Sequence, residues 1–167
     1  MALSNLTTYL LNGFVLVIPI LIFNILFARK LPREFSPEHF DEGILPALLI
    51  GENILRGLVM FLPLLMPLSF ESTGQKIGLL LYVAGTLIYF LSWILLMRFP
   101  QLVSKWFAFA APAYTPLLWL IGIGLIGNRL FFSIPYQPWI YFGGSLLFIT
   151  FHVWHTTLAY KKVTPQA

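Results

Sequence analysis

Apolar residues run through this chain in five long blocks that are separated by short polar segments. The blocks lie at about residues 6–28, 44–68, 77–97, 106–126 and 139–160. Each has about 20 mostly apolar residues, the length that an α-helix needs to cross the hydrocarbon core of a bilayer. The blocks and their connections use all 167 residues. We therefore predict an all-α integral membrane protein, a single domain over residues 1–167 formed by one bundle of five transmembrane helices.

The composition points to the same class. Charged residues make up 10% of the chain and hydrophobic residues 59%, whereas a soluble domain usually has about 25% charged residues. A chain with so few charges cannot cover a water-facing surface, so the lipid bilayer is its first expected partner. The sequence contains no cysteine, which excludes disulfides and thiolate metal sites.

Basic residues are distributed unevenly over the polar segments. Seven Lys and Arg residues lie in segments 29–43, 98–105 and 161–162, and two, Lys76 and Arg129, lie in the segments between them. Cytoplasmic loops collect Lys and Arg, so we predict an outside N-terminus, a cytoplasmic C-terminus and a multi-pass protein of a bacterial inner (plasma) membrane. The net charge of +4 then reflects topology, and we expect no nucleic-acid partner.

One glycine pattern falls inside an apolar block and another at the start of one. Residues 122–127 (GIGLIG) match the G-x-G-x-x-G pattern of dinucleotide-binding loops. That function requires a strand before the glycines and a helix that begins at them, whereas these glycines lie late in an apolar block. We therefore predict that they pack helices together. Gly74 and Gly78 have the small-x-x-x-small spacing that permits close helix contact in membranes.

The first cytoplasmic loop has the features of a short interfacial helix. Ser36, Pro37 and Glu38 combine an N-cap residue, a proline in the first turn and an acid near the helix N-terminus. Gly43 would end this turn. We expect the charged residues of the loop to form a solvated face.

Ionisable residues interrupt two of the apolar blocks. Glu52 and Arg56 are four residues apart in the second block, so they share one helix face. His152 and His155 are three residues apart in the last block and share a face for the same reason. A charged group at the centre of a membrane helix costs roughly 2.5–3.5 kcal/mol on insertion scales. We therefore expect both pairs to face the interior of the bundle.

The predicted topology places the two pairs at similar depth. At a rise of about 1.5 Å per residue, Glu52 and His152 each lie about two turns from the cytoplasmic surface. Polar and aromatic residues from the other three helices fall in the same half of the membrane, which predicts a shared cavity there. The candidate ligand-binding residues are Asn24, Glu52, Asn53, Arg56, Tyr89, Trp93, Tyr114, His152 and His155.

Three functions are compatible with this set of residues. The first is binding or transport of a small anionic or lipid-soluble ligand, in which Arg56 pairs with an anionic group and Glu52 sets the charge or carries a proton. The second is a membrane enzyme that uses Glu52 with His152 or His155 as acid and base on an isoprenoid- or lipid-like substrate. The third is a non-catalytic subunit or assembly factor whose polar residues only hold helices together. The sequence does not separate these functions.

A metal site is the weaker interpretation of the same residues. Two imidazoles and a carboxylate can bind zinc or iron, which makes Glu52, His152 and His155 weak candidates as ligands. The spacing His-x-x-His alone is unspecific, so we predict no metal. The sequence indicates no particular cofactor and is compatible with a homo-oligomer.

The architecture resembles the tryptophan-rich translocator family in outline. The resemblance rests on five spans in a chain of this length, on an aromatic content of 17% and on the segment 135–139 (PYQPW) before the last helix. It implies a five-helix membrane bundle. The Trp- and Pro-rich motif of that family's first connection is absent here, where the chain reads ARKLPREFSPEHF, so no ligand or functional residue is transferred.

Overall fold

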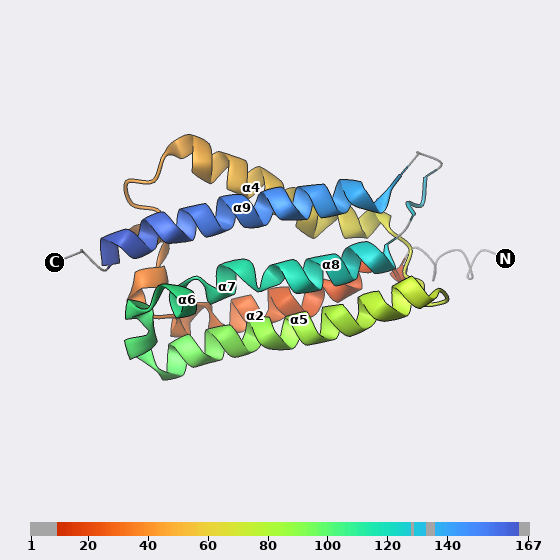
Figure 1. Cartoon of the computed structure of the whole chain (residues 1–167). Coiled ribbons are helices and arrows are strands. Elements are labelled where there is room, and N and C mark those ends of the chain that lie inside the picture. Colours follow the sequence, from red (N-terminus) through yellow and green to blue (C-terminus); the bar gives the residue numbers. More distant parts are fainter. Residues whose placement is uncertain (1–9, 128, 133–135, 164–167) are drawn as a thin grey trace.

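The computed structural model describes residues 10–127, 129–132 and 136–163, and its named elements are all helices (Figure 1). The expected all-α fold is therefore confirmed over this part of the chain, while the expected start of the first helix near residue 6 lies outside it. One isolated antiparallel bridge joins Asn12 and Pro67. The longer elements are α2 (Ile18–Phe27), α4 (Pro46–Phe61), α5 (Thr73–Arg98), α8 (Pro116–Ile126) and α9 (Pro138–Val163). The 3-10 helix η1 (Gly13–Leu16) precedes α2, and α4 continues into the 3-10 helix η4 (Leu62–Leu65).

Prolines set several of the helix boundaries. Pro46, Pro116 and Pro138 each stand at the first position of a helix, where the missing N–H costs nothing. In the fourth apolar block, Pro112 and Pro116 divide the chain into α6 (Trp106–Phe109), α7 (Ala111–Tyr114) and α8. The hydroxyl of Thr115 donates to the carbonyl of Ala111 at 2.7 Å at this interruption. The fourth block is thus a broken helix.

The helices form two layers (Figure 1). In one layer α4 and α9 lie side by side, and in the other α5 packs against α8, with α8 also contacting α9. The helix α2 contacts α5 through the stacked rings of Phe23 and Phe90. Two buried tyrosines link helices through backbone carbonyls: Tyr141 donates to Val59 O at 3.0 Å and Tyr82 donates to Leu16 O at 2.8 Å. Such bonds satisfy a hydroxyl where water is absent.

Three segments among the described residues are long and apolar enough to cross a membrane by length and composition: Gly13–Lys30, Pro46–Leu65 and Thr73–Arg98. This supports the prediction of a membrane protein. The fourth predicted span is the shorter apolar stretch Ala111–Ile126. The fifth, α9, has 26 residues and includes both histidines and a basic end.

Glycines permit the closest contact between helices. A Cβ atom at Gly122 of α8 would lie 2.5 Å from Tyr82 N of α5, and one at Gly78 would lie 2.8 Å from Gly122 O. Gly124 and Gly127 are similarly tight against Phe142 and Met66. The packing interpretation of residues 122–127 is thereby supported. Gly74 and Gly78 were both expected to permit close helix contact. The prediction is confirmed for Gly78, which meets α8, and wrong for Gly74, where only the Ser72 hydroxyl oxygen lies within 4 Å of a Cβ.

The first connection contains short helices at its predicted place. Here η2 (Ala28–Lys30) and η3 (Arg33–Phe35) precede α3 (Pro37–Phe40), and η5 (Pro100–Ser104) occupies the third connection. The Ser36 carbonyl accepts from His39 N and Phe40 N, while its hydroxyl pairs with His39 Nδ1 at 2.9 Å. Gly43 has a φ of 60°, a left-handed conformation that glycine adopts without strain, and it lies in the turn before α4.

Candidate functional site

Glu52 lies at the centre of a polar cluster between α4 and α9. Its exposed fraction is 1%. Its Oε1 contacts Arg56 Nη2 and lies 2.9 Å from His152 Nδ1, and its Oε2 lies 2.7 Å from His155 Nδ1. The two pairs that the sequence placed on separate helices at equal depth therefore meet at one carboxylate.

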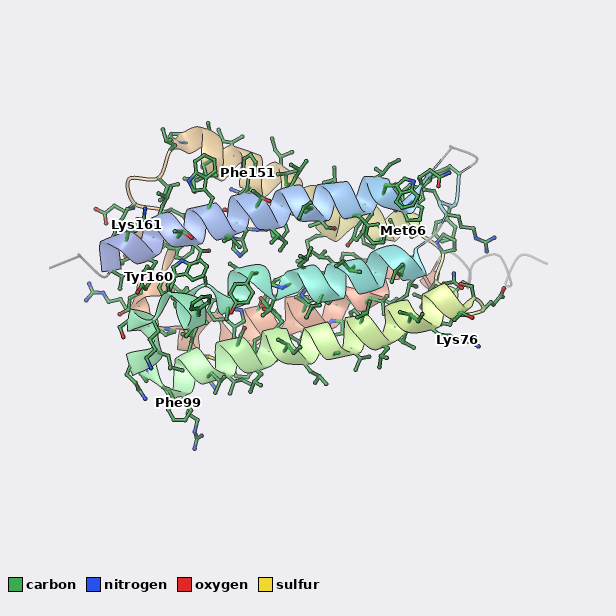
Figure 2. The ribbon with its side chains drawn as sticks, in the orientation of Figure 1. Met66, Lys76, Phe99, Phe151, Tyr160 and Lys161 are labelled. Carbon is green, nitrogen blue, oxygen red and sulfur yellow. The ribbon has the colours of Figure 1, made fainter. Side chains whose placement is uncertain are left out.

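The packing of α4 on α9 brings these side chains together. Gly51, next to Glu52, is so close to α9 that a Cβ would lie 2.7 Å from Phe151 Cε1, and Figure 2 shows Phe151 beside α4. Because residues three and four apart share a helix face, His152 and His155 both reach Glu52 across this contact. The absence of a side chain at Gly51 thus lets α4 approach α9 closely enough for Glu52 to contact both histidines.

Arg56 connects the cluster to a cavity. Its Nη1 donates to Asn53 Oδ1 at 3.2 Å, and its side chain is 45% exposed although its ion-pair partner is buried. The cavity has a volume of about 270 Å³ and is mostly lined by aromatic and aliphatic side chains from α2, α4, α5, α8 and α9. The polar or indole residues of its lining are Asn24, Arg56, Tyr89, Trp93, Trp119 and His152.

Hydrogen-bond donors dominate the polar part of this lining. Tyr89 donates its hydroxyl to Asn24 Oδ1 at 2.8 Å, which leaves the Asn24 amide N–H groups as donors. The indole N–H of Trp119 is buried without a partner among the described residues. None of the described lining residues is acidic, so the formal charge on the wall is the positive charge of Arg56.

A smaller pocket of about 50 Å³ shares Arg56 with this cavity and is lined by Asp41, Leu49, Glu52, Asn53, Arg56 and His155. Here the Nε2 atom of His155 lies 3.3 Å from Phe40 O and 3.3 Å from Asp41 Oδ1. The sequence analysis missed Asp41, because the acids of the first connection were expected to form a solvated face. Asp41 lies in a turn that brings it to His155 of α9, a position that could not be inferred from spacing.

One candidate lies apart from this site. Tyr114 is 38% exposed and donates its hydroxyl to Phe107 O at 3.0 Å, and it does not line the cavity. The prolines on either side of it break the helix, so its direction does not follow from helical periodicity. The other eight candidates line the cavity or the adjoining pocket.

The two imidazoles of the cluster are turned toward its carboxylate. Both Nδ1 atoms lie within hydrogen-bond distance of oxygens of Glu52, and Nε2 of His155 faces Phe40 O and Asp41. Within the described part of the chain, no group of three or more His, Cys, Asp or Glu residues is arranged to hold a metal.

Comparison with known proteins adds no relative: the chain matches no protein-family model, no curated protein and no solved structure.

Proposed function

We propose that this protein is a five-span membrane protein that binds a small lipid-soluble ligand through its anionic group. The observation that carries the proposal is the position of Arg56 on the wall of a mainly apolar cavity whose described lining has no acid. A guanidinium presents five N–H donors in a planar fork that matches a carboxylate or phosphate. Two of its nitrogens already bind Glu52 and Asn53, which hold the side chain in place.

The histidines leave Arg56 available for a ligand. Glu52 lies within hydrogen-bond distance of His152 and His155 and also contacts Arg56, so its pairing does not depend on Arg56 alone. Arg56 can therefore turn part of its donor fork toward the cavity without leaving a buried carboxylate unpaired, which would be costly. Arg56 can therefore bind Glu52 and an anionic ligand at the same time.

The size and walls of the cavity indicate the rest of the ligand. Ligand pockets usually have about 300–1,000 Å³, so a cavity of about 270 Å³ suits a small molecule or the head of a longer one. Phe23, Phe27, Met60 and Phe148 supply the apolar wall. Only Ile20 of α2 is fully buried, which makes the α2 side of the cavity the natural entrance from lipid.

The proposed topology keeps the N-terminus outside and the cluster in the cytoplasmic half of a bacterial inner membrane. Figure 2 shows Phe99, Tyr160 and Lys161 at one end of the bundle and Met66 and Lys76 at the other. The connections that carry most of the basic residues share the first of these ends (Figure 1), as the positive-inside rule requires of the cytoplasmic side.

One observation favours an enzyme as the second candidate. His152 lines the cavity while its Nδ1 faces Glu52, the arrangement of a general base oriented by a carboxylate. Turnover of a lipid-like substrate that is lost in His152→Gln, with ligand retention kept, would favour this candidate over simple binding.

Native mass spectrometry of the detergent-purified protein tests the proposal. We expect a retained anionic small molecule in the wild type and in Arg98→Met, a change at the end of α5, and its loss in Arg56→Met. Retention that is unchanged in Arg56→Met would contradict the role of Arg56. A co-purified protein chain with no small molecule in any variant would instead favour the non-catalytic subunit.

A further inference from the structure

We propose that Asp41, His155, Glu52 and His152 form a proton-transfer path between the cytoplasmic surface and the cavity. The four side chains are consecutive hydrogen-bond or ion-pair partners, with separations of 3.3 Å, 2.7 Å and 2.9 Å between the facing atoms. They come from the turn before α4, from α9, from α4 and again from α9. The inference rests on the cavity of the proposed function and goes beyond binding, because it assigns a route for protons.

The path begins at an exposed carboxylate and passes through buried side chains. The Asp41 side chain is 50% exposed, whereas the side chains of His155 and Glu52 are 4% and 2% exposed. His152, at the far end, is 22% exposed and lines the cavity. Exposure is thus high at the surface, nearly absent in the middle and regained at the cavity, the profile expected of a relay.

His155 is placed between acceptors on both sides. Its Nε2 faces Phe40 O and the carboxylate of Asp41, and its Nδ1 faces Glu52 Oε2. A neutral imidazole carries one N–H, and an imidazolium carries two. Only the protonated ring can donate on both sides at once, so a proton gained at Nε2 is matched by one ready to leave from Nδ1.

Each step conserves protons and needs no redox partner. The carboxyl of Asp41 gives a proton to Nε2 of His155, and Nδ1 of His155 gives a proton to Oε2 of Glu52. Rotation of the carboxyl group, whose terminal torsion is broad and roughly two-fold, moves that proton to the side of His152. With its own proton on Nε2, neutral His152 accepts this proton at Nδ1 and releases the Nε2 proton to an acceptor in the cavity, so one proton enters and one leaves.

Other charged and titratable groups surround the path. Arg56 of α4 contacts the same Oε1 that faces His152. Lys162 of α9 approaches the turn, its Nζ lying 3.7 Å from where a Cβ of Gly43 would be. Tyr89 of α5 lines the same cavity as His152, and the Phe148 ring stacks on His152 with centroids 5.4 Å apart.

Ring N–H exchange in ¹⁵N-histidine-labelled protein in lipid nanodiscs tests the path. The chain has three histidines, so single His→Gln variants assign every signal. We expect Asp41→Asn to slow exchange of the His152 ring proton with water by about tenfold or more, because the surface donor is lost. Glu42→Gln, a neighbouring acid outside the path, is the matched control and should leave the rate unchanged.

A second variant addresses the buried link. His155→Gln should slow exchange at His152 at least as much as Asp41→Asn does. Exchange at His152 that is equally fast in wild type and Asp41→Asn would overturn the path. The measurement needs no added ligand, so its failure is distinguishable from a failure of ligand retention in Arg56→Met.

Discussion

A carboxylate buried to 1% exposure, as Glu52 is, needs donors on both oxygens because desolvation of a charge is expensive. Arg56 and His152 contact Oε1 of Glu52, and His155 contacts Oε2. The cluster is therefore more than the intrahelical ion pair that the spacing of Glu52 and Arg56 alone would suggest. It joins α4 to α9 through a shared anion.

Substitution of the two members of the ion pair should have unequal effects on stability. Glu52→Gln should lower the free energy of unfolding by about 2–3 kcal/mol, because the new amide N–H group faces a donor and leaves it unpaired. Arg56→Met should cost less than Glu52→Gln does, because Glu52 keeps both histidines as partners when the half-exposed Arg56 is removed. Thermal unfolding in detergent measures both, and a larger loss in Arg56→Met than in Glu52→Gln would contradict this account.

The depth and direction of a side chain in the cluster could be predicted from the sequence where the residue lies on a regular helix. Glu52 and His152 lie on unbroken helices, so depth and face followed from helical rise and periodicity. Asp41 belongs to a turn whose direction depends on the left-handed Gly43, and Tyr114 lies between two helix-breaking prolines. Side chains on such segments have no period from which to infer a direction.

At the scale of elements, the close contact between α5 and α8 depends on glycines, which have no side chain. A Cβ at Gly122 would meet the backbone of Tyr82, and backbone cannot move aside as a flexible side chain can. Small residues at such points let membrane helices approach until van der Waals contact is extensive. The α5–α8 pair also forms the far wall of the cavity, through Tyr89, Trp93 and Trp119.

Alanine at Gly122 should therefore separate these helices. We expect Gly122→Ala to destabilise the protein by about 1–3 kcal/mol, the range for overpacking. Gly143→Ala is the matched control, because a Cβ there meets nothing within 4 Å, and it should be neutral or stabilising by up to about 1 kcal/mol from helix propensity. Equal melting temperatures in detergent for the two variants would argue against the close contact.

At the scale of the whole molecule, the exposed surface and the distribution of basic residues bear on the proposed orientation in lipid. Large apolar side chains face outward on α2, α4, α5, α8 and α9, among them Ile25, Ile54 and Leu80, which are 74%, 65% and 70% exposed. Such a surface would aggregate in water and suits acyl chains. The connections that carry most of the basic residues gather at the end where α9 finishes (Figure 1).

Single cysteines can test this orientation, because the sequence has none of its own. Glu38 and Gln137 are both exposed and lie in connections at opposite ends of the bundle. In intact cells, a membrane-impermeant maleimide should label Gln137→Cys and spare Glu38→Cys until the membrane is opened. Labelling of Glu38→Cys in intact cells would show that the topology is inverted.

The central claim, that Arg56 and its cluster bind the anionic group of an apolar ligand, is tested most directly by thermal unfolding with a matched pair of probes. Dodecanoate and its methyl ester differ mainly in the charge of the head. A ligand that binds only the folded protein raises its melting temperature, so dodecanoate should raise it more than the ester does in the wild type and in Arg98→Met. The difference should vanish in Arg56→Met. Equal shifts from both probes in the wild type, or a difference that persists in Arg56→Met, would contradict the account.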